Sequence, residues 1–157
     1  MTGQKHGLDL RTAVIDTILD DMLRLPPHPD VIPALTQLQD AGFRMATLTN
    51  SAPPALAAQL AYAGLTDFFE RQLSVDAIGL FKPAPETYHY AADQLKTAVH
   101  NIRLVAAHDW DVTGAIRAGT QAAFVARPGM VLGETAEIPD IIGSDLLSIA
   151  DQLQHRS

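Results

Sequence analysis

LVAAHDWDVTGAIRAG, residues 104–119, is the most informative part of the sequence for the fold. A short apolar run ends in a polar segment with two carboxylates, Asp109 and Asp111, and a Thr-Gly pair comes next. Short bounded apolar runs are typical of buried strands, so a strand is predicted over 102–107 and a helix over 112–118. In parallel α/β sheets ligands bind at the carboxyl ends of strands, and both carboxylates stand at such an end.

Strands and helices are predicted to alternate over the rest of the chain. The other predicted strands are 43–48, 72–75, 121–126 and 141–142, and the other predicted helices are 9–24, 30–38, 53–64, 85–95 and 146–153. We expect Asp30 to cap the second helix with its side chain. This alternation indicates an α/β fold with a parallel sheet.

Length and composition restrict the class of protein. The 157 residues predict one domain, and 47% hydrophobic content provides for a packed core. The formal net charge of −7 disfavours nucleic acid and anionic membranes as partners. Without cysteine, disulfides and thiolate metal sites are excluded. The polar N-terminus and the lack of long apolar runs predict no membrane span and a cytoplasmic location.

Polar clusters come directly after three of the predicted strands. They are Thr49-Asn50-Ser51, then Asp76 with Lys82 nearby, and then residues 108–111. Thr49 and Asn50 stand before a helix N-terminus, where free N–H groups attract anions. Plain N-capping by these side chains explains their presence equally well. The convergence of three clusters on one edge of the sheet favours a site.

Each of the charged and aromatic candidates has a structural alternative. Lys82 either orients carboxylates beside a proline-fixed turn or lies solvated in a loop. Asp111 either caps a helix, pairs with Lys82 or serves in catalysis. Trp110 either packs in the core or belongs to the site. His108 is either a structural histidine that forms hydrogen bonds or a residue of the site. The case for a site depends on their occurring together.

Three runs carry a resemblance to a known family: GFRMATLTNSAP at 42–53, LSVDAIGLFKPAPETYHYAADQL at 73–95, and VAAHDWDVTGAIRAGTQAAFVARPG at 105–129. In order and spacing they resemble the haloacid dehalogenase superfamily, and most closely the L-2-haloacid dehalogenases (type II). The resemblance implies a Rossmann-like parallel sheet and a substrate that is a small 2-haloacid or another small carboxylate.

The resemblance also implies roles for individual residues. In that family an aspartate attacks the halogen-bearing carbon, and water then hydrolyses the aspartyl ester. Thr49 matches the residue that holds the substrate carboxylate, and Asn50 matches one near the leaving halide. Lys82 matches the lysine that orients the nucleophile, Tyr88 a substrate-site tyrosine, and Asp111 the acidic residue that helps to activate water.

The chain departs from the family at the strand before Asp111. Ala106 and Ala107 replace polar residues, and His108 stands where many of these dehalogenases have asparagine; His108 and Trp110 remain candidates for substrate binding. Magnesium phosphatases of the superfamily carry an aspartate where Ala106 stands. Because magnesium needs several oxygen ligands, we expect no metal and no cofactor, and the phosphatase branch of the superfamily is disfavoured.

A larger departure concerns the family's first motif, an apolar strand that leads into Asp-x-x-Gly-Thr, which contains the nucleophile. Its nearest imitation is TAVIDTILDD at 12–21, where Asp16 lacks the Gly-Thr and lies in a predicted helix. We therefore expect residues 1–25 to be the last part of a helical cap. Residues 26–157 are expected to form a Rossmann-like core that lacks its central first strand.

That missing strand would lie between the strands predicted at 43–48 and 102–107. Two bare inner edges leave backbone groups unpaired. We expect the chain to pair these edges directly, to borrow a strand from a partner, or to form a homodimer.

Two classes of function remain open. The chain is either the larger part of a dehalogenase-type hydrolase, inactive without a nucleophile from elsewhere, or a non-catalytic domain for binding small carboxylates or for assembly. A phosphatase is the third and weakest hypothesis.

Overall fold

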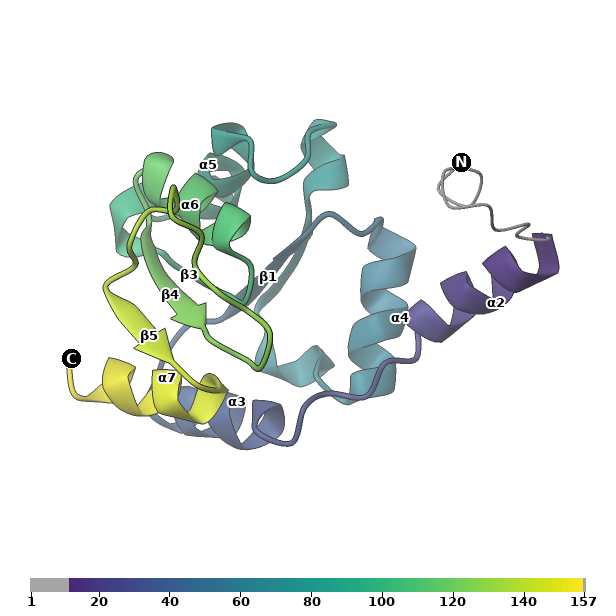
Figure 1. Ribbon diagram of the computed structural model, residues 1–157, viewed down its shortest axis with the longest axis horizontal. Helices are drawn as coiled ribbons and strands as arrows, with labels where there is room; N and C mark the ends of the chain where they lie inside the picture. Colours follow the sequence, from purple (N-terminus) through teal and green to yellow (C-terminus); the bar gives the residue numbers. More distant parts are fainter. Residues whose placement is uncertain (1–11, 157) are drawn as a thin grey trace.

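The computed structural model describes residues 12–156 as a layered α/β fold in which every strand pair is parallel (Figure 1). The strands are β1 (Ala46–Thr49), β2 (Arg71–Ser74), β3 (Arg103–Ala106), β4 (Gln121–Val125) and β5 (Ile141–Gly143). The helices are α2 (Thr12–Met22), α3 (Val31–Asp40), α4 (Pro53–Ala63), α5 (Pro85–Gln94), α6 (Asp109–Arg117) and α7 (Leu146–Gln154). Short 3₁₀ turns lie at Thr66–Phe68, Val75–Ile78 and Val99–Asn101. The predicted α/β class and the order of its elements are confirmed.

Proline and glycine set several of the boundaries. Pro53 and Pro85 occupy the first turns of α4 and α5, where a missing N–H costs nothing. Gly64 ends α4 in the left-handed region at φ 69°. Helix α6 begins at Asp109, three residues before the predicted start, so both carboxylates of the opening stretch lie in its first turn. Negative charge is favourable there because it faces the positive end of the helix dipole.

The strands form two sheets instead of one. Strand β1 pairs with β2, and the order of the second sheet is β3-β4-β5. Within residues 12–156 no ladder joins β1 to β3. The two inner edges, β1 and β3, were expected to pair directly, to take up a strand from a partner or to lie in a homodimer interface. Direct pairing is not observed in the described part of the chain.

Helices on both faces hold the two sheets together (Figure 1). On one face α3 and α7 form a cluster around Ala34, Leu38 and Ala150, against which Phe43 and Met45 pack. On the other face Tyr88 of α5 clusters with Ala115 of α6 and with Ala118, which follows the end of α6. Leu48 of β1 and Leu104 of β3 pack against this cluster. Apolar contacts between side chains, and not backbone hydrogen bonds, thus connect the two sheets.

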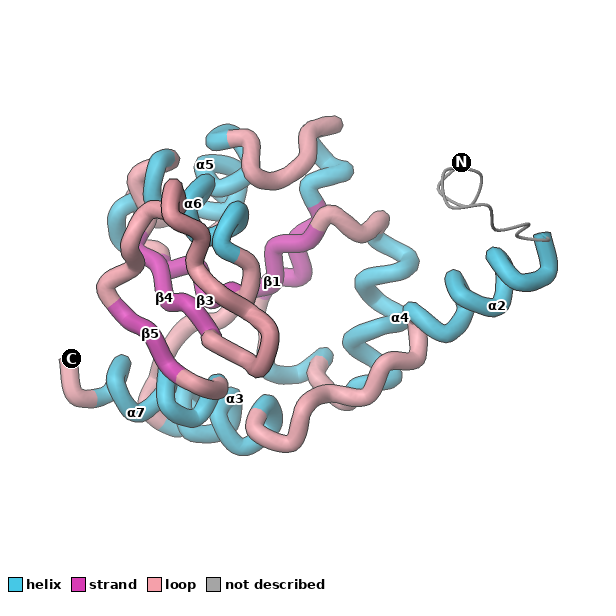
Figure 2. The backbone as a smooth tube through the Cα atoms, viewed as in Figure 1, coloured by secondary structure: helices cyan, strands magenta, loops and turns pink. Residues whose placement is uncertain are grey.

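Helix α2 extends away from this body beside α4 (Figures 1 and 2). The predicted helix is confirmed over 12–22, and residues 9–11 lie outside the described residues. Its apolar stripe is exposed, with Val14, Ile18 and Met22 at 45%, 48% and 50%. The Nε2 group of Gln59 on α4 donates to the Met22 carbonyl over 3.2 Å. None of the helices within 12–156 has the length and apolar composition that crossing a membrane requires.

Asp30 corrects one prediction. It stands at the N-cap position of α3, but its side chain makes no capping hydrogen bond. Both carboxylate oxygens instead accept from the Arg127 guanidinium, at 3.0 and 2.9 Å, and one also accepts from the Leu146 N–H at 2.8 Å. This ion pair ties the start of α3 to the end of β4 and the start of α7.

Candidate active site

Three of the predicted site residues form one buried cluster. The Lys82 Nζ lies 2.6 Å from Oδ2 of Asp111, with the two side chains only 11% and 6% exposed. The Tyr88 hydroxyl donates to the other carboxylate oxygen, Oδ1, over 2.7 Å. Of the three uses considered for Asp111, pairing with Lys82 is observed. Its two oxygens are thereby held in fixed directions by a cation and a phenol.

Different elements bring these groups together. Lys82 precedes α5, Tyr88 lies within α5, and Asp111 lies in the first turn of α6. The contact between α5 and α6 needs a glycine, because a Cβ on Gly114 would lie 2.5 Å from the Pro83 Cβ and 2.9 Å from the Tyr88 hydroxyl oxygen. Sequence reasoning missed Gly114, although the Thr-Gly pair at the start of a helix was its visible signal.

Burial keeps the Tyr88 phenol protonated well beyond physiological pH. Removal from water raises the pKa of its phenol well above the ordinary value, and the hydrogen bond to Asp111 and that residue's negative charge raise it further. The phenol therefore remains a donor over the whole physiological pH range. It can stabilise the Asp111 carboxylate without competing with it for a proton.

The end of β1 reaches the cluster through Asn50. The Asn50 Oδ1 accepts from the Lys82 backbone N–H over 2.9 Å, which fixes the turn that carries the lysine. The Thr49 Oγ1 accepts from the Ser51 N–H over 3.1 Å. The N-cap residue of α4 is Ala52, without a side-chain bond. Helix capping therefore does not account for the polar residues at 49–51.

His108 and Trp110 lie at the edge of the cluster. Their ring centroids are 5.7 Å apart, and the Lys82 Nζ is 6.0 Å from the Trp110 ring. Trp110 is 42% exposed, so it is not a core packing residue. At this distance the indole can attract the ammonium weakly.

Two other acidic residues stand apart from the cluster. Asp76 is exposed, and its backbone N–H donates to the Ser74 hydroxyl. The Asp109 carboxylate accepts from the Trp110 and Gly133 N–H groups, at 2.7 and 3.3 Å. Asp109 thus fastens the loop after β4 to the start of α6.

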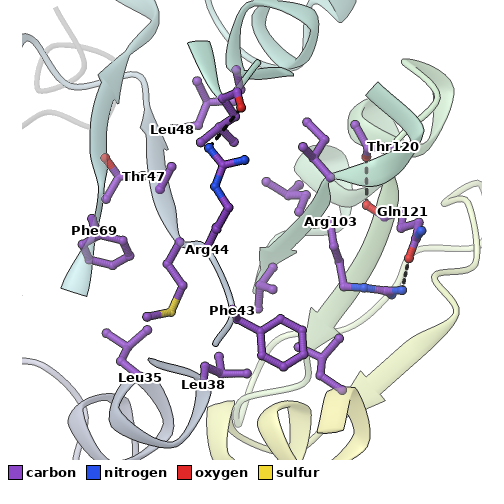
Figure 3. A pocket seen from close by; sticks show the side chains of 18 of the residues that line it. Leu35, Leu38, Phe43, Arg44, Thr47, Leu48, Phe69, Arg103, Thr120 and Gln121 are labelled. Carbon is purple, nitrogen blue, oxygen red and sulfur yellow. Dashed lines mark hydrogen bonds between the residues drawn. The ribbon is translucent and has the colours of Figure 1, made fainter. Parts of the chain in front are cut away.

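A cleft of about 870 Å³ leads from the cluster along the gap between the sheets. Figure 3 shows Thr47 and Leu48 of β1 on one side, Arg103 of β3 on the other, and Leu35 and Leu38 of α3 at one end. The three clustered residues, Lys82, Tyr88 and Asp111, also line it. Over residues 12–156 no three His, Asp or Glu side chains gather in a way that would hold a metal ion.

Comparison with known proteins gives consistent results. The model of the haloacid dehalogenase-like hydrolase family matches residues 3–119. The chain is 35% identical over 139 residues to the (S)-2-haloacid dehalogenase of Pseudomonas sp. (strain YL), covering 88% of this chain and 60% of that protein. It is 40% identical over 104 residues to the (S)-2-haloacid dehalogenase of Xanthobacter autotrophicus, covering 66% of this chain and 40% of that one.

Solved structures agree in fold. The L-2-haloacid dehalogenase from Xanthobacter autotrophicus with chloropropionic acid covalently bound superimposes with a TM-score of 0.88 at 29% identity, over 98% of this chain and 71% of that one. The chain spans about 60% of the length of the first curated relatives it matches. Both the sequence and the fold therefore place this chain in the haloacid dehalogenase-like hydrolase family.

Proposed function

We propose that this chain supplies most of the active site of a hydrolase that releases halide from small 2-haloacids. The observation that carries the proposal is the buried cluster of Lys82, Asp111 and Tyr88 at one end of the open cleft. The curated relatives are named 2-haloacid dehalogenases, which supports this substrate class.

In the proposed reaction an aspartate oxygen attacks C2 of the haloacid, and the carbon–halogen bond breaks as halide leaves with the bonding electrons. Water then adds to the ester carbonyl, and the ester divides into a 2-hydroxyacid and the regenerated aspartate, with release of one proton. Thr49 and Asn50 would hold the substrate carboxylate and the leaving halide, and His108 and Trp110 would border the substrate.

The residues of this chain act on charge and position. The Lys82 ammonium would hold the nucleophilic carboxylate ionised and aligned, since a cation at hydrogen-bond distance favours the charged form. Asp111, held by Lys82 and Tyr88, would accept the proton of the attacking water. Within residues 12–156 the one ion-pair partner of Lys82 is Asp111, so the nucleophile would come from a segment outside the described residues.

We also propose that residues 1–25 correspond to the end of a helical cap and residues 26–157 to the core, in the cytoplasm. The exposed stripe of α2, which extends from the body, supports this division because a cap helix would bury that stripe against other cap helices.

A halide assay tests the proposed function. The chain is incubated with L-2-chloropropionate, first by itself and then together with the part of the Pseudomonas relative that it does not match. We expect no chloride from either part alone and chloride from the mixture, and none from a mixture with Lys82→Ala. A mixture that is folded and associated but inactive would contradict the proposal.

The alternative is a domain that binds small carboxylates without turnover. It is favoured by the absence, among residues 12–156, of a second carboxylate paired with Lys82. Calorimetric binding of L-lactate by a chain that never releases halide in any mixture would support it.

A further inference from the structure

Ser74 at the end of β2 holds the turn that follows β1. In the β1–β2 ladder Ser74 lies opposite Thr49, so the last residues of the two strands are side by side. The serine is only 5% exposed. Its hydroxyl donates to the Ser51 carbonyl over 2.6 Å and accepts from the Asp76 N–H over 3.2 Å. The side chain therefore joins the two strands beyond the last pair of the ladder.

Helix capping alone does not explain this serine. Ser74 is the N-cap residue of the 3₁₀ turn at Val75–Ile78, and an N-cap needs only the bond that it accepts from Asp76. The bond that it donates goes to Ser51, after the other strand, and is the shorter of the two. Over residues 12–156 the Ser51 carbonyl accepts no hydrogen bond from a backbone N–H, so it depends on the Ser74 hydroxyl.

Two side-chain donors in the turn after β1 remain available to a ligand. The Thr49 Oγ1 accepts from the Ser51 N–H, which leaves the threonine O–H proton for another acceptor. The Asn50 Oδ1 accepts from the Lys82 N–H, which leaves the asparagine NH₂ group. Within residues 12–156 neither of these donors has an acceptor.

The N-terminus of α4 supplies few donors of its own. A helix normally offers free N–H groups in its first turn. Pro53 and Pro54 occupy the first two positions of α4, and proline has no N–H. Binding of an anion at this helix end therefore depends mainly on Thr49 and Asn50, whose directions are set by the turn that Ser74 holds.

We propose that Ser74 is a positioning residue of the candidate site. By holding the Ser51 peptide, its hydroxyl keeps the Thr49 O–H and the Asn50 NH₂ group directed toward the anionic groups of the ligand. Those groups are the carboxylate and the departing halide of the proposed reaction, so the assignment rests on the proposed function. Without the hydroxyl, the Ser51 carbonyl and the Asp76 N–H lose their partner, and the turn shifts to regain one. A displacement of about 1 Å can lower a rate by about a hundredfold.

Binding of L-lactate to the whole chain tests the assignment without turnover. Calorimetry gives the dissociation constant, and the NMR signal of the Asn50 NH₂ group shows whether the ligand reaches the turn. We expect saturable binding by the wild type and about tenfold weaker binding by Ser74→Ala. Ser74→Thr keeps the hydroxyl and should restore most of the affinity.

Thr120→Val is the matched control. Thr120 is 8% exposed, and its hydroxyl donates to the Gln121 carbonyl at the opposite end of the sheet. This variant also loses a nearly buried hydroxyl, but its affinity for L-lactate should stay that of the wild type. If Ser74→Ala does not fold, Ser74→Cys is the second variant. It keeps the volume of serine with only a weak donor, and it should show the same weakening.

Turnover separates positioning from plain stabilisation. In the mixture used for the halide assay, kcat/KM reports the transition state relative to the free enzyme and substrate. Chloride is smaller than bromide and concentrates its negative charge, so it depends more on hydrogen bonds as it leaves. Ser74→Ala should therefore lower kcat/KM several times more for L-2-chloropropionate than for L-2-bromopropionate. A variant that only unfolds more easily would lower both equally.

Several outcomes would overturn the assignment. These are no L-lactate binding by the wild type, equal binding by Ser74→Ala, an equal loss in Thr120→Val, or an unchanged ratio of kcat/KM for the two haloacids in Ser74→Ala. If Ser74→Ala loses L-lactate binding but no mixture releases halide, the positioning role stands and the proposed function fails. If the mixture releases halide and Ser74→Ala is as active as the wild type, the function stands and the positioning role fails.

Discussion

The Lys82 ammonium and the Asp111 carboxylate form an ion pair of 2.6 Å that is almost withdrawn from water. Within such a pair each charge compensates the cost of burying the other. Removal of one partner leaves the remaining charge buried and unpaired. The pair is therefore a structural element of this fold as well as the centre of the candidate site.

Asp111→Asn should lower the free energy of unfolding by about 3 kcal/mol, because the Lys82 charge loses its partner. Urea denaturation at pH 7 measures the change, with Glu137→Gln as control. Glu137 pairs with Arg117 at the surface, where both side chains are more than 40% exposed, so its replacement should change stability little. Equal changes in the free energy of unfolding for the two substitutions would show that the buried pair stabilises the fold no more than a surface pair does.

Tyr88→Phe should destabilise the chain by about 1–3 kcal/mol, since Asp111 Oδ1 loses the phenol donor. The pH dependence distinguishes this bond from packing. The folded pKa of Tyr88 lies above the ordinary 10.0, so its contribution is complete below pH 10 and is lost as pH rises beyond it. Stability above pH 10 should therefore fall less steeply in the variant, and parallel curves for the two proteins would contradict this assignment.

For Gly114→Ala the sign of the change in stability is the decisive result. In an ordinary helix interior this substitution stabilises by about 0.5–1 kcal/mol. Here the new Cβ meets Pro83 and Tyr88 at 2.5 and 2.9 Å, so we expect destabilisation by about 1–3 kcal/mol and a larger effect for Gly114→Ser. Thermal unfolding gives the sign directly, and a stabilised alanine variant would mean that the turn carrying Lys82 is not tightly held.

The Asp30–Arg127 ion pair should make the free energy of unfolding depend on pH below about pH 4. The hydrogen bonds from Arg127, together with the weaker effect of the Leu146 N–H, lower the pKa of Asp30 from 3.8 to about 2 against the opposing effect of burial. Its contribution, on the order of 1–2 kcal/mol after allowance for solvent screening, is present above pH 4 and is lost as pH falls toward 2. The difference between wild type and Asp30→Asn should therefore shrink from pH 6 to pH 2.5 in urea titrations. A constant difference would contradict it.

The helices and strands were predicted well because each is specified by residues that are neighbours in the sequence. Pro53, Gly64 and Pro85 mark helix ends through the backbone of one or two residues, and the apolar runs at 102–107 and 121–126 give strands. Lys82 and Asp111 both follow predicted strands, and the carboxyl ends of parallel strands lie at one edge of the sheet. Their position in the sequence therefore already suggested that the two side chains could pair.

The failures involve partners far apart in the sequence. Asp30 was expected to cap α3, but its carboxylate is taken by Arg127, 97 residues later. Asn50 was considered a capping residue, yet it bonds to Lys82, 32 residues away. The need for glycine at 114 depends on how closely α5 approaches α6, which no local pattern contains.

The proposed activity requires that this chain hold and orient a nucleophile that another segment supplies. Intact-mass spectrometry can locate that nucleophile. The chain is mixed with the part of the Pseudomonas relative that it does not match, and the mixture is quenched during turnover of L-2-chloropropionate. We expect a propionate ester on the added segment, at its aspartate, and an unmodified mass for this chain. An ester on this chain, or chloride released by this chain alone, would contradict the proposed division of the active site.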